Sequence, residues 1–528
     1  MQIYLYLSTF FASLGMFQFG YQSSVLNVPQ IQVEEFLKDT FRKRNLGIIS
    51  DRTAFTLFSV ATSLTLVGGL IGALASGWIG NKFGRRNGLI GLQLLVISAA
   101  CFGGICDVCD SFELLFLSRL LAGFASGAFT GLVPLYVSEI APIELRGATA
   151  TCCNLTCCVG TLMAMVLGLK DVLGKPDIWS YVLFVPAIPA ILQLSCMPLM
   201  PESPRYLLIN KRNLEKARKS LELLRGNEKV DQEIQEIFDN ENSSEIKDIH
   251  DDLEDTEHLV DNHLSIFQVL KQSKYWLPLF ITICMQLSSQ ATGVVALLFY
   301  STKFFHEAGL SCTLSSWSSV GIGGIFLVVT ILSVLLMERL GRRTLHVYIG
   351  LTGMLLSSLV LNFSLIEESY KETQNTTSAD CSSPIAQTGT NSGTSVYGIL
   401  VVVSSLSCVT LFGIGPGCIP WFITSEIFEE APRAGATSIA MFSNWAFQIL
   451  VAITFPQLHL SLGSYSFTPY LFILFLTWLI LLYYLPETKN QSSSKIFRIF
   501  QQHNAWLKPI GFQSTRFLES LNNDVLET

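Results

Sequence analysis

The sequence predicts an all-α polytopic membrane protein with twelve transmembrane helices arranged as two six-helix repeats. Three observations lead to this prediction. Half of the 528 residues are hydrophobic and only 14% are charged, whereas a soluble domain carries about 25% charged residues. Apolar stretches of about 20 residues, the length that crosses a bilayer, recur along the chain. Three short motifs occur twice, in the same order, in the two halves of the sequence.

Twelve apolar stretches are long enough to span a membrane. They lie near residues 4–27, 54–79, 88–109, 113–137, 148–170, 179–200, 275–302, 315–337, 345–366, 395–424, 434–459 and 466–485. The first stretch has no basic region before it and no small-residue cleavage site after it. We therefore expect a retained helix there and not a cleaved signal peptide.

Charged residues gather between the sixth and seventh stretches. Residues 201–274 hold 17 acidic and 11 basic side chains, which is 28 of the 75 charged residues in the chain. So few charges elsewhere exclude a soluble multidomain enzyme, a disordered chain and a nucleic-acid binder. We expect a six-helix bundle over 1–200, a cytoplasmic linker with short interfacial helices over 201–274, a second bundle over 275–488 and a cytoplasmic tail over 489–528. A regulatory partner site in the linker is the alternative.

Basic loops predict the orientation, because Lys and Arg concentrate on the cytoplasmic side of membrane helices. The short loops after the second and eighth stretches are both basic, with Lys82, Arg85, Arg86, Arg339, Arg342 and Arg343. We expect an integral protein of the plasma membrane with both termini in the cytoplasm. Asn375-Thr376-Thr377 then lies in an outer loop, where the motif accepts a glycan.

The repeated motifs are the strongest signal in the sequence. Gly84-Arg85-Arg86 recurs as Gly341-Arg342-Arg343, Ser138-Glu139 with Arg146 recurs as Ser425-Glu426 with Arg433, and Pro201-Glu202-Ser203 recurs as Pro486-Glu487-Thr488. Each copy follows the same helix of its repeat at the cytoplasmic end. Parallel six-helix repeats of this kind are typical of transporters whose substrate site lies at mid-membrane between the two halves.

The repeated charges predict a network of ion pairs between helix ends at the cytoplasmic face. Its expected members are Arg85, Arg86, Glu139, Arg146, Glu202, Arg205, Glu338, Arg342, Arg343, Glu426, Arg433 and Glu487. One exposed pair contributes about 0–1 kcal/mol, so several pairs would bias a conformational equilibrium and leave it reversible. The alternative is that these charges only fix the topology.

Further motifs run along nearly the whole chain. They are Phe19-Gly20-Tyr21, Val133-Pro134-Leu135, Arg146-Gly147-Ala148, Pro201-Glu202-Ser203-Pro204-Arg205, Gln286-Leu287-Ser288, Tyr300-Ser301-Thr302, Glu338 to Arg343, Gly415-Pro416-Gly417, Pro420-Trp421-Phe422, Asn444-Trp445 and Pro486-Glu487-Thr488-Lys489. With them the chain resembles the facilitative glucose transporter (sugar porter) family of the major facilitator superfamily. The resemblance implies the major facilitator fold and passive, alternating-access transport of a hexose. Gln286-Leu287-Ser288 favours D-glucose over fructose. No enzymatic activity and no cofactor are implied.

The resemblance also implies which residues meet the sugar. Family members contact it at positions matching Gln290, Asn444, Trp421 and Trp445, and the neighbouring candidates are Gln286, Ser289 and Asn154. Phe299 and Tyr300 are the candidate gating residues. Amides suit the hydroxyls of a sugar and aromatic rings suit its C–H faces. As alternatives, an intramembrane Asn can serve only to bond a neighbouring helix, and a Trp can be a core residue.

Several positions depart from the family pattern. Ser289 stands where the family has a second Gln, Asn154 replaces a longer Gln, and the apolar residues Val295, Phe326 and Gly413 stand where polar residues are usual. Losing three or four neutral hydrogen bonds costs roughly 2–6 kcal/mol of binding free energy. A carrier of another polar solute, such as dehydroascorbate or a polyol, and a non-transporting sugar receptor therefore stay open as alternatives.

The first helix predicts transport without protons. Proton-coupled relatives carry a carboxylate just after the Phe-Gly-Tyr motif, facing an Arg on the fourth helix. Here that position is Gln22, and no Asp or Glu occurs between Met1 and Pro29, while Arg119 is retained. A coupled carrier needs a group that gains and loses a proton, so we expect uniport.

The cysteines do not predict a metal site. Cys152, Cys153, Cys157 and Cys158 spread around the fifth helix, whereas metal ligands must converge on one point. We expect these thiols to act as small apolar packing groups. Cys106, Cys109, Cys312 and Cys381 lie near the outer face, where disulfides are allowed, but the sequence assigns no pair.

Overall fold

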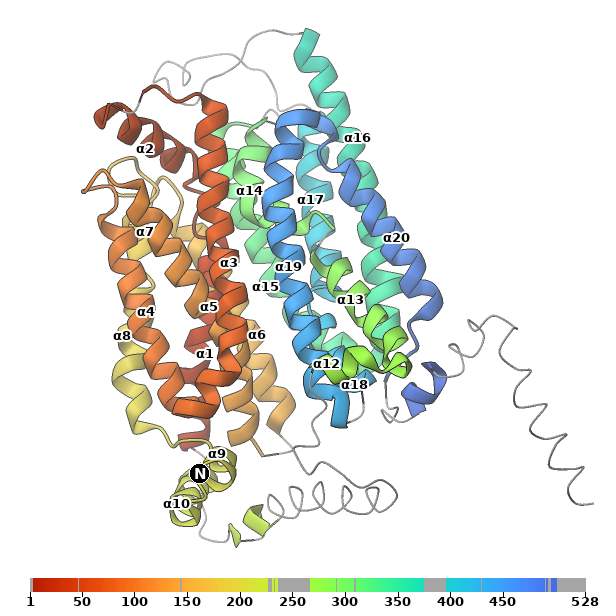
Figure 1. Cartoon of the computed structure of the whole chain (residues 1–528). Coiled ribbons are helices and arrows are strands. Elements are labelled where there is room, and N and C mark those ends of the chain that lie inside the picture. The colour runs from red at the N-terminus through yellow and green to blue at the C-terminus, as the bar shows by residue number, and fades with distance from the viewer. Residues whose placement is uncertain are drawn as a thin grey trace, which may run out of the picture.

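Long helices account for the regular structure of the chain. The computed structural model describes residues 3–45, 47–142, 145–226, 230–231, 233–235, 266–290, 292–307, 310–374, 396–428, 430–489, 491 and 495–500. Every regular element in these ranges is helical. The helices stand side by side as an N-terminal and a C-terminal group (Figure 1).

The N-terminal group contains the first six predicted spans. Its helices are α1 (Ile3–Ser24), α3 (Asp51–Phe83), α4 (Arg85–Ile105), α5 (Phe112–Ile140), α6 (Arg146–Leu167), α7 (Tyr181–Phe184) and α8 (Ala187–Cys196). Helices α7 and α8 together form the sixth span, and a short 3₁₀ turn, Met197–Leu199, follows them.

The C-terminal group contains the other six. Its helices are α13 (Trp276–Gln290), α14 (Val294–Glu307), α15 (Cys312–Leu340), the π-helical η4 (Thr344–Leu351), α16 (Thr352–Gln374), α17 (Val396–Ile414), α18 (Pro420–Ile427), α19 (Glu430–Leu462) and α20 (Thr468–Tyr484). Ten segments of the described chain are long and apolar enough to cross a membrane, and two shorter apolar helices, Cys152–Leu167 and Thr468–Tyr484, accompany them. These segments match the twelve predicted stretches, so the predicted fold class is confirmed.

Two spans are broken in a way that the sequence analysis did not predict. The seventh span divides into α13 and α14 near Gly293, whose φ is +84°. The tenth divides into α17 and α18 around Gly415-Pro416-Gly417. A Cβ atom on Gly415 would lie 2.4 Å from the carbonyl oxygen of Leu345, so this break fits closely against the π-helical turn η4.

Short helices cap the two ends of the bundle. Helix α2 (Gln30–Lys43) covers one end, which we call the α2 end, and α9 (Pro204–Ile209), α10 (Leu214–Arg225) and α12 (Ile266–Lys271) lie at the opposite α10 end (Figure 1). Helix α10 buries its apolar face against Leu208 of α9. The N-terminus also lies at the α10 end (Figure 1). Short helices were expected in this part of the linker, whereas most of residues 227–265 lie outside the described residues.

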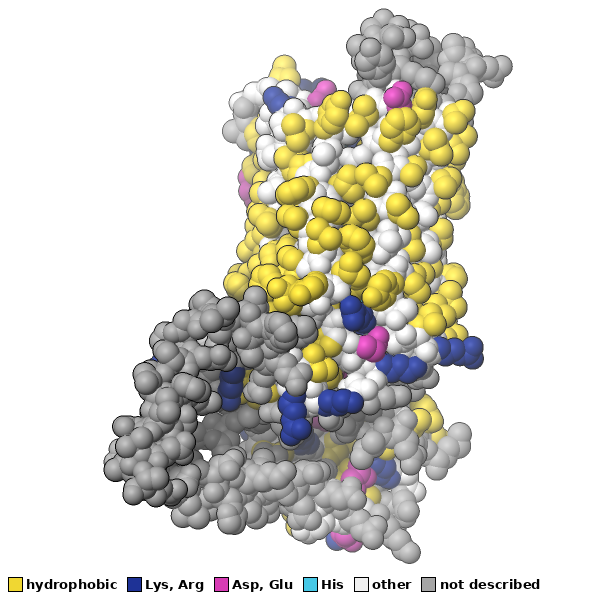
Figure 2. Space-filling view, turned by 90° about the vertical axis from the view of Figure 1, so that its right-hand side faces the viewer, with side chains coloured by type: hydrophobic (Ala, Val, Ile, Leu, Met, Phe, Trp, Pro, Cys, Tyr) yellow, Lys and Arg dark blue, Asp and Glu magenta, His cyan; other side chains and the backbone are white. Residues whose placement is uncertain are grey.

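The sides of the bundle are apolar. Figure 2 shows hydrophobic side chains covering the middle of one side, with Lys and Arg gathered toward the α10 end. Large side chains of the spanning helices, such as Leu74, Ile188 and Val328, are exposed. A water-soluble protein rarely exposes apolar surface of this extent, so the surface fits the hydrocarbon core of a bilayer.

Candidate functional site

A buried amide pair joins three segments of the C-terminal group. Asn444 of α19 donates from Nδ2 to Oε1 of Gln286 on α13, at 2.8 Å. Gln286 in turn donates from Nε2 to the carbonyl oxygen of Pro420 at the start of α18, at 2.9 Å. Both side chains are buried. The two predicted site residues therefore meet, and the pair also ties the helices together.

Gln290 and Ser289 lie one turn further along α13, at its end. Gln290 donates from Nε2 to the Ser289 hydroxyl at 3.3 Å, and both are buried. This is the hydrogen bond that the Gln290 side chain makes among the described residues. Both polar side chains therefore lie next to the break that separates α13 from α14.

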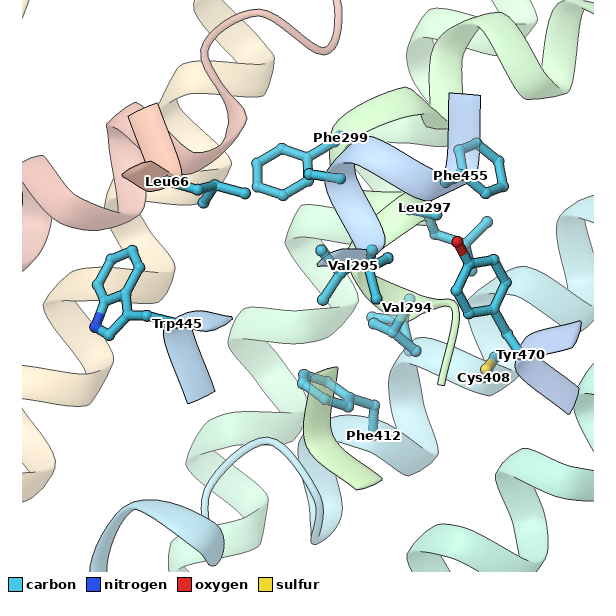
Figure 3. Packing of buried hydrophobic residues seen from close by; sticks show 14 of the residues in the cluster. Leu66, Val294, Val295, Leu297, Phe299, Cys408, Phe412, Trp445, Phe455 and Tyr470 are labelled. Carbon is cyan, nitrogen blue, oxygen red and sulfur yellow. The ribbon is translucent and has the colours of Figure 1, made fainter. Parts of the chain in front are cut away.

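Trp445 connects the two helix groups. Its indole extends from α19 toward the N-terminal group (Figure 3), where it meets the Phe19 ring of α1 at a centroid distance of 6.0 Å. A Cβ atom on Gly69 of α3 would lie 2.3 Å from the indole, so only glycine leaves room for it. The side chain is 2% exposed, and its Nε1–H has no hydrogen-bond partner among the described residues. Trp421 of α18 is half-buried.

The three apolar positions that depart from the family pattern, Val295, Phe326 and Gly413, lie among apolar side chains, which we call the apolar wall. Val295 of α14 is buried in the same cluster as Phe412 and Trp445 (Figure 3). The rings of Phe326 and Phe412 lie 6.0 Å apart. A Cβ atom on Gly413 would lie 3.0 Å from a methyl group of Val329. These side chains offer contact surface to a ligand but no hydrogen bonds.

Helix α6 contacts the C-terminal group through small polar side chains. Asn154 donates from Nδ2 to the Cys418 sulfur at 3.6 Å, and the Cys158 thiol lies 3.4 Å from the Thr330 hydroxyl. Asn154 is half-buried at this junction. Its amide is therefore engaged with a residue of the tenth span and not with α6 itself.

The cysteines do not gather into a metal site. Among the described residues no cluster of three or more His, Cys, Asp or Glu side chains could hold a metal ion. Eleven of the cysteines that the structure describes are free thiols. Cys312, at the start of α15, is disulfide-bonded, a feature that the cysteine pattern of the sequence did not assign.

Aromatic side chains join the two groups toward the α2 end. The Tyr300 ring of α14 lies 6.0 Å from Phe55 and 6.1 Å from Phe58, both on α3, and 5.5 Å from Phe455 on α19. Phe299 points toward Leu66 of α3 (Figure 3). The two candidate gating residues therefore lie in the contact between the groups.

Two polar contacts at the same end escaped the sequence analysis. Asn27, just after α1, donates from Nδ2 to the Leu298 carbonyl at 2.7 Å and to the Ser301 hydroxyl at 2.8 Å. Lys303 pairs with Glu34 of α2 at 3.3 Å. Both contacts join residues about 270 positions apart, and no motif marks them. They hold the α2 end of the described bundle closed.

The buried arginine of α5 faces the position that lacks a carboxylate. Arg119 donates from one terminal nitrogen to Gln22 Oε1 at 2.5 Å and from the other to the Gln22 carbonyl at 2.8 Å. Both residues line a small cavity together with Asn27 and Phe299. The guanidinium is thus held by neutral oxygens of α1.

Charged side chains form a compact cluster at the α10 end of the N-terminal group. Arg85 pairs with Glu139 at 2.9 Å, and the Ser203 hydroxyl donates to the same carboxylate. Glu202 Oε1 accepts the backbone N–H groups of Arg85 and Arg86 at 3.0 and 2.9 Å. Gly84 turns the chain between α3 and α4 with φ +97°, a region open essentially to glycine alone.

The C-terminal group repeats this cluster. Arg342 pairs with Glu426 at 3.1 Å, and the Thr488 hydroxyl donates to Glu426 at 2.6 Å. Glu487 accepts the backbone N–H groups of Arg342 and Arg343 at 2.8 and 3.1 Å. Gly341 has φ +90°. The sequence repeat therefore corresponds to a structural repeat.

Each of these ion pairs lies within one helix group. Arg433 donates to the Phe428 carbonyl at 3.3 Å, also within its own group, and Arg205 is exposed on α9. The side chains of Arg146 and Glu338 lie outside the described residues. The Arg85–Glu139 and Arg342–Glu426 pairs thus tie helix ends together inside each group.

Comparison with known proteins agrees with this geometry. The family model described as Sugar (and other) transporter matches residues 8–500. The facilitated glucose transporter member 3 of solute carrier family 2 from Ovis aries is 36% identical over 490 residues, which cover 93% of this chain and 91% of the relative. The Homo sapiens protein of that name is 36% identical over 496 residues, 94% and 92% of the two chains. The partially occluded inward-open structure of the xylose transporter XylE from E. coli has a TM-score of 0.70 at 22% identity and covers 93% of this chain and 99% of its own.

Proposed function

Because the chain belongs to the Sugar (and other) transporter family, we propose that it carries a hexose passively across the membrane by alternating access. D-Glucose is the hexose that we propose as its substrate. The relatives from sheep and human named above are facilitated glucose transporters. One observation supports the proposal most directly. The Gln286–Asn444 amide pair and the Trp445 Nε1–H, which has no partner in the described part of the chain, are buried among the helices.

Buried polar groups of this kind are suited to a sugar. An unpaired buried N–H costs about 1–3 kcal/mol, which a hydroxyl of the ligand would recover. Amides offer both donors and acceptors to further hydroxyls, and the indole face suits the C–H side of the ring. We assign Gln286, Ser289, Gln290, Trp421, Asn444, Trp445 and Asn154 to the substrate site.

The contact between Arg119 and Gln22 supports uniport. A neutral amide occupies the position facing the arginine, and the described part of α1 holds no acidic side chain. Proton coupling needs a group that changes its charge during the cycle. Transport therefore follows the sugar gradient alone.

The packing between the groups supports alternating access. Phe299 and Tyr300 close the α2 end together with Asn27, and we assign them to the gate on that side. The repeated charge clusters stay within their own groups, so each group can move as a unit. We assign the remaining network residues, Arg146, Arg205, Glu338 and Arg433, to the gate at the α10 end.

The orientation follows from the same assignment. We place the α10 end, both termini and residues 201–274 and 489–528 in the cytoplasm, with bundles over 1–200 and 275–488, in the plasma membrane. The α2 end then faces outward. Asn375, the candidate glycan acceptor, lies outside the described residues.

Uptake into proteoliposomes tests the proposal. Purified protein is compared with empty vesicles for labelled D-glucose, L-glucose, galactose, fructose, a polyol and dehydroascorbate. We expect saturable D-glucose uptake that exceeds L-glucose uptake, and its loss in Gln286→Ala. Uptake confined to dehydroascorbate or the polyol would contradict the hexose assignment. Sugar binding without flux would contradict transport and favour a receptor.

A further inference from the structure

A pocket lies at the α10 end, away from the proposed sugar site. Its volume is about 580 Å³, which is within the range of small-molecule sites, about 300–1,000 Å³. Residues at the junction between α3 and α4 line one wall, and residues of α9 and α10 line the other. The lining residues that matter are Phe83, Arg86, Tyr206, Lys211, Lys216 and Lys219.

The pocket carries a strong positive charge. Four basic side chains line it against one carboxylate, Glu202, and Glu202 already accepts backbone N–H groups from the α4 start. Lys219 pairs with Glu215 at 2.8 Å. Lys211 and Lys216 are exposed and have no ion-pair partner among the described residues. Two ammonium groups are therefore free to meet an anion.

One wall of the pocket contains a buried polar group without a partner. Tyr206 of α9 is 2% exposed, and its hydroxyl makes no hydrogen bond among the described residues. Two cations lie near its ring, the Arg85 guanidinium at 5.0 Å and the Lys211 ammonium at 5.8 Å from the ring centroid. A phosphate oxygen in the pocket would give this hydroxyl an acceptor.

The rim of the pocket is apolar on the side of the bundle. Phe83 and Leu223 line the pocket and are 50% and 45% exposed. Trp78, further up α3, is 58% exposed, and the Lys82 ammonium lies 4.6 Å from its ring centroid. Exposed Trp beside Lys is typical of the membrane–water interface. The pocket thus opens where head groups meet acyl chains.

We infer that this pocket binds the phosphorylated head group of an anionic phospholipid. The phosphates would contact Lys211, Lys216 and Arg86, the Tyr206 hydroxyl would donate to a phosphate oxygen, and Phe83 and Leu223 would face the glycerol and the upper acyl chains. Clusters of basic residues next to a membrane helix recognise such lipids. A soluble phosphate compound shares the charge but not the contact with the apolar rim.

Lipid binding to the intact protein tests this inference. The protein is placed in phosphatidylcholine nanodiscs that contain a small fraction of phosphatidylinositol bisphosphate, and the retained anionic lipid is measured by native mass spectrometry. We expect the double variant Lys211→Ala with Lys216→Ala to weaken retention of the anionic lipid about 25-fold. Each cation near an anionic lipid contributes a factor of roughly five to the affinity. Tyr206→Phe, which keeps the ring, should weaken it about 2- to 10-fold.

A double variant of the opposite end is the matched control. Lys170→Ala with Lys175→Ala removes the same charge from exposed positions near the α2 end and should retain the lipid. Equal loss in both double variants would mean that lipid gathers by net charge alone and would overturn the inference. Tight binding of ATP in pure phosphatidylcholine nanodiscs, together with displacement of the anionic lipid by ATP in the mixed nanodiscs, would also overturn it, because the pocket would then take a soluble phosphate.

Discussion

Single side chains connect the proposed sugar site to the moving parts of the molecule. Trp445 belongs to α19 but lies against Gly69 and Phe19 of the N-terminal group. A sugar bonded to its Nε1–H would therefore contact a residue that both groups share. Separation of the groups would change the surroundings of this side chain first.

Replacing Trp445 tests this role. Trp445→Phe keeps an aromatic face and removes the indole N–H, so one hydrogen bond to the ligand is lost. That loss of about 0.5–1.5 kcal/mol should weaken apparent glucose affinity roughly 2- to 13-fold. Competition of labelled glucose uptake by unlabelled sugar measures the change. Unchanged affinity in a folded variant would remove the N–H from the binding site.

Restoring polarity to the apolar wall should have the opposite effect. Val295→Asn with Phe326→Asn supplies amides where the family has them, and we expect stronger glucose uptake at low sugar concentration. Val329→Ala is the control, because it alters the same wall beside Gly413 without adding a polar group. No change in a folded double variant would mean that these two positions do not line the sugar path.

At this scale the sequence predicted some contacts and missed others. Gln286 and Asn444, both candidates for sugar contact from the sequence, bond each other in the structure. Asn27 could not be predicted, because its partners Leu298 and Ser301 are distant in sequence and lie in no repeated motif. Only the packing of α1 against α14 brings them together.

The turns at Gly84 and Gly341 repeat both their backbone conformation and their hydrogen bonds. Gly84 and Gly341 adopt the same backbone conformation, and each is followed by two N–H groups that bond one carboxylate, Glu202 or Glu487. The carboxylate satisfies donors at a helix start, where four N–H groups lack partners within the helix. The arginine side chains then pair with a second carboxylate on a neighbouring helix.

Gly84→Ala should disrupt this turn. The backbone angle is unfavourable for alanine by about 1–3 kcal/mol, and the added Cβ would lie 2.5 Å from Glu202 Oε2. We expect a lower thermal unfolding midpoint in detergent. Gly77→Ala is the matched control, because nothing lies within 4 Å of its Cβ position, and it should leave the midpoint unchanged or raise it. Equal behaviour of the two variants would contradict the account of the turn.

The junction of α1 with α14 should control the gate at the α2 end. Asn27→Ala removes two donated hydrogen bonds, about 1–3 kcal/mol in total, so the closed state should lose population. Hydrogen exchange over residues 294–307 should rise. Ser23→Ala is the control, because in the described part of the chain the Ser23 hydroxyl bonds the Phe19 carbonyl of its own helix. Equal exchange in wild type and Asn27→Ala would show that this junction does not hold the gate.

The helices themselves were predictable, but their interruptions were not. Apolar composition identified the spans, because a bilayer requires about 20 apolar residues in a row. The apolar composition continues through the break between α13 and α14 and through the break after α17. Composition therefore does not reveal these two breaks. The second break depends on the fit of Gly415 against Leu345 of η4, a contact that exists only in the folded bundle.

The whole molecule combines two similar helix groups with different contacts at the two ends. Aromatic and amide side chains join the groups at the α2 end, whereas the Arg85–Glu139 and Arg342–Glu426 pairs at the α10 end each stay within one group. Such an arrangement lets the groups separate at the α10 end while the gate at the α2 end is closed. The energy for net movement of substrate must then come from the substrate gradient, because Arg119 faces the neutral Gln22.

The steady-state distribution of D-glucose across proteoliposomes tests the central claim most directly. Vesicles are given equal glucose on both sides, and an inward or outward pH gradient is imposed with and without a protonophore. A passive uniporter should exchange labelled glucose rapidly and keep the inside and outside concentrations equal under every condition. Accumulation of glucose against its gradient, abolished by the protonophore, would contradict the account.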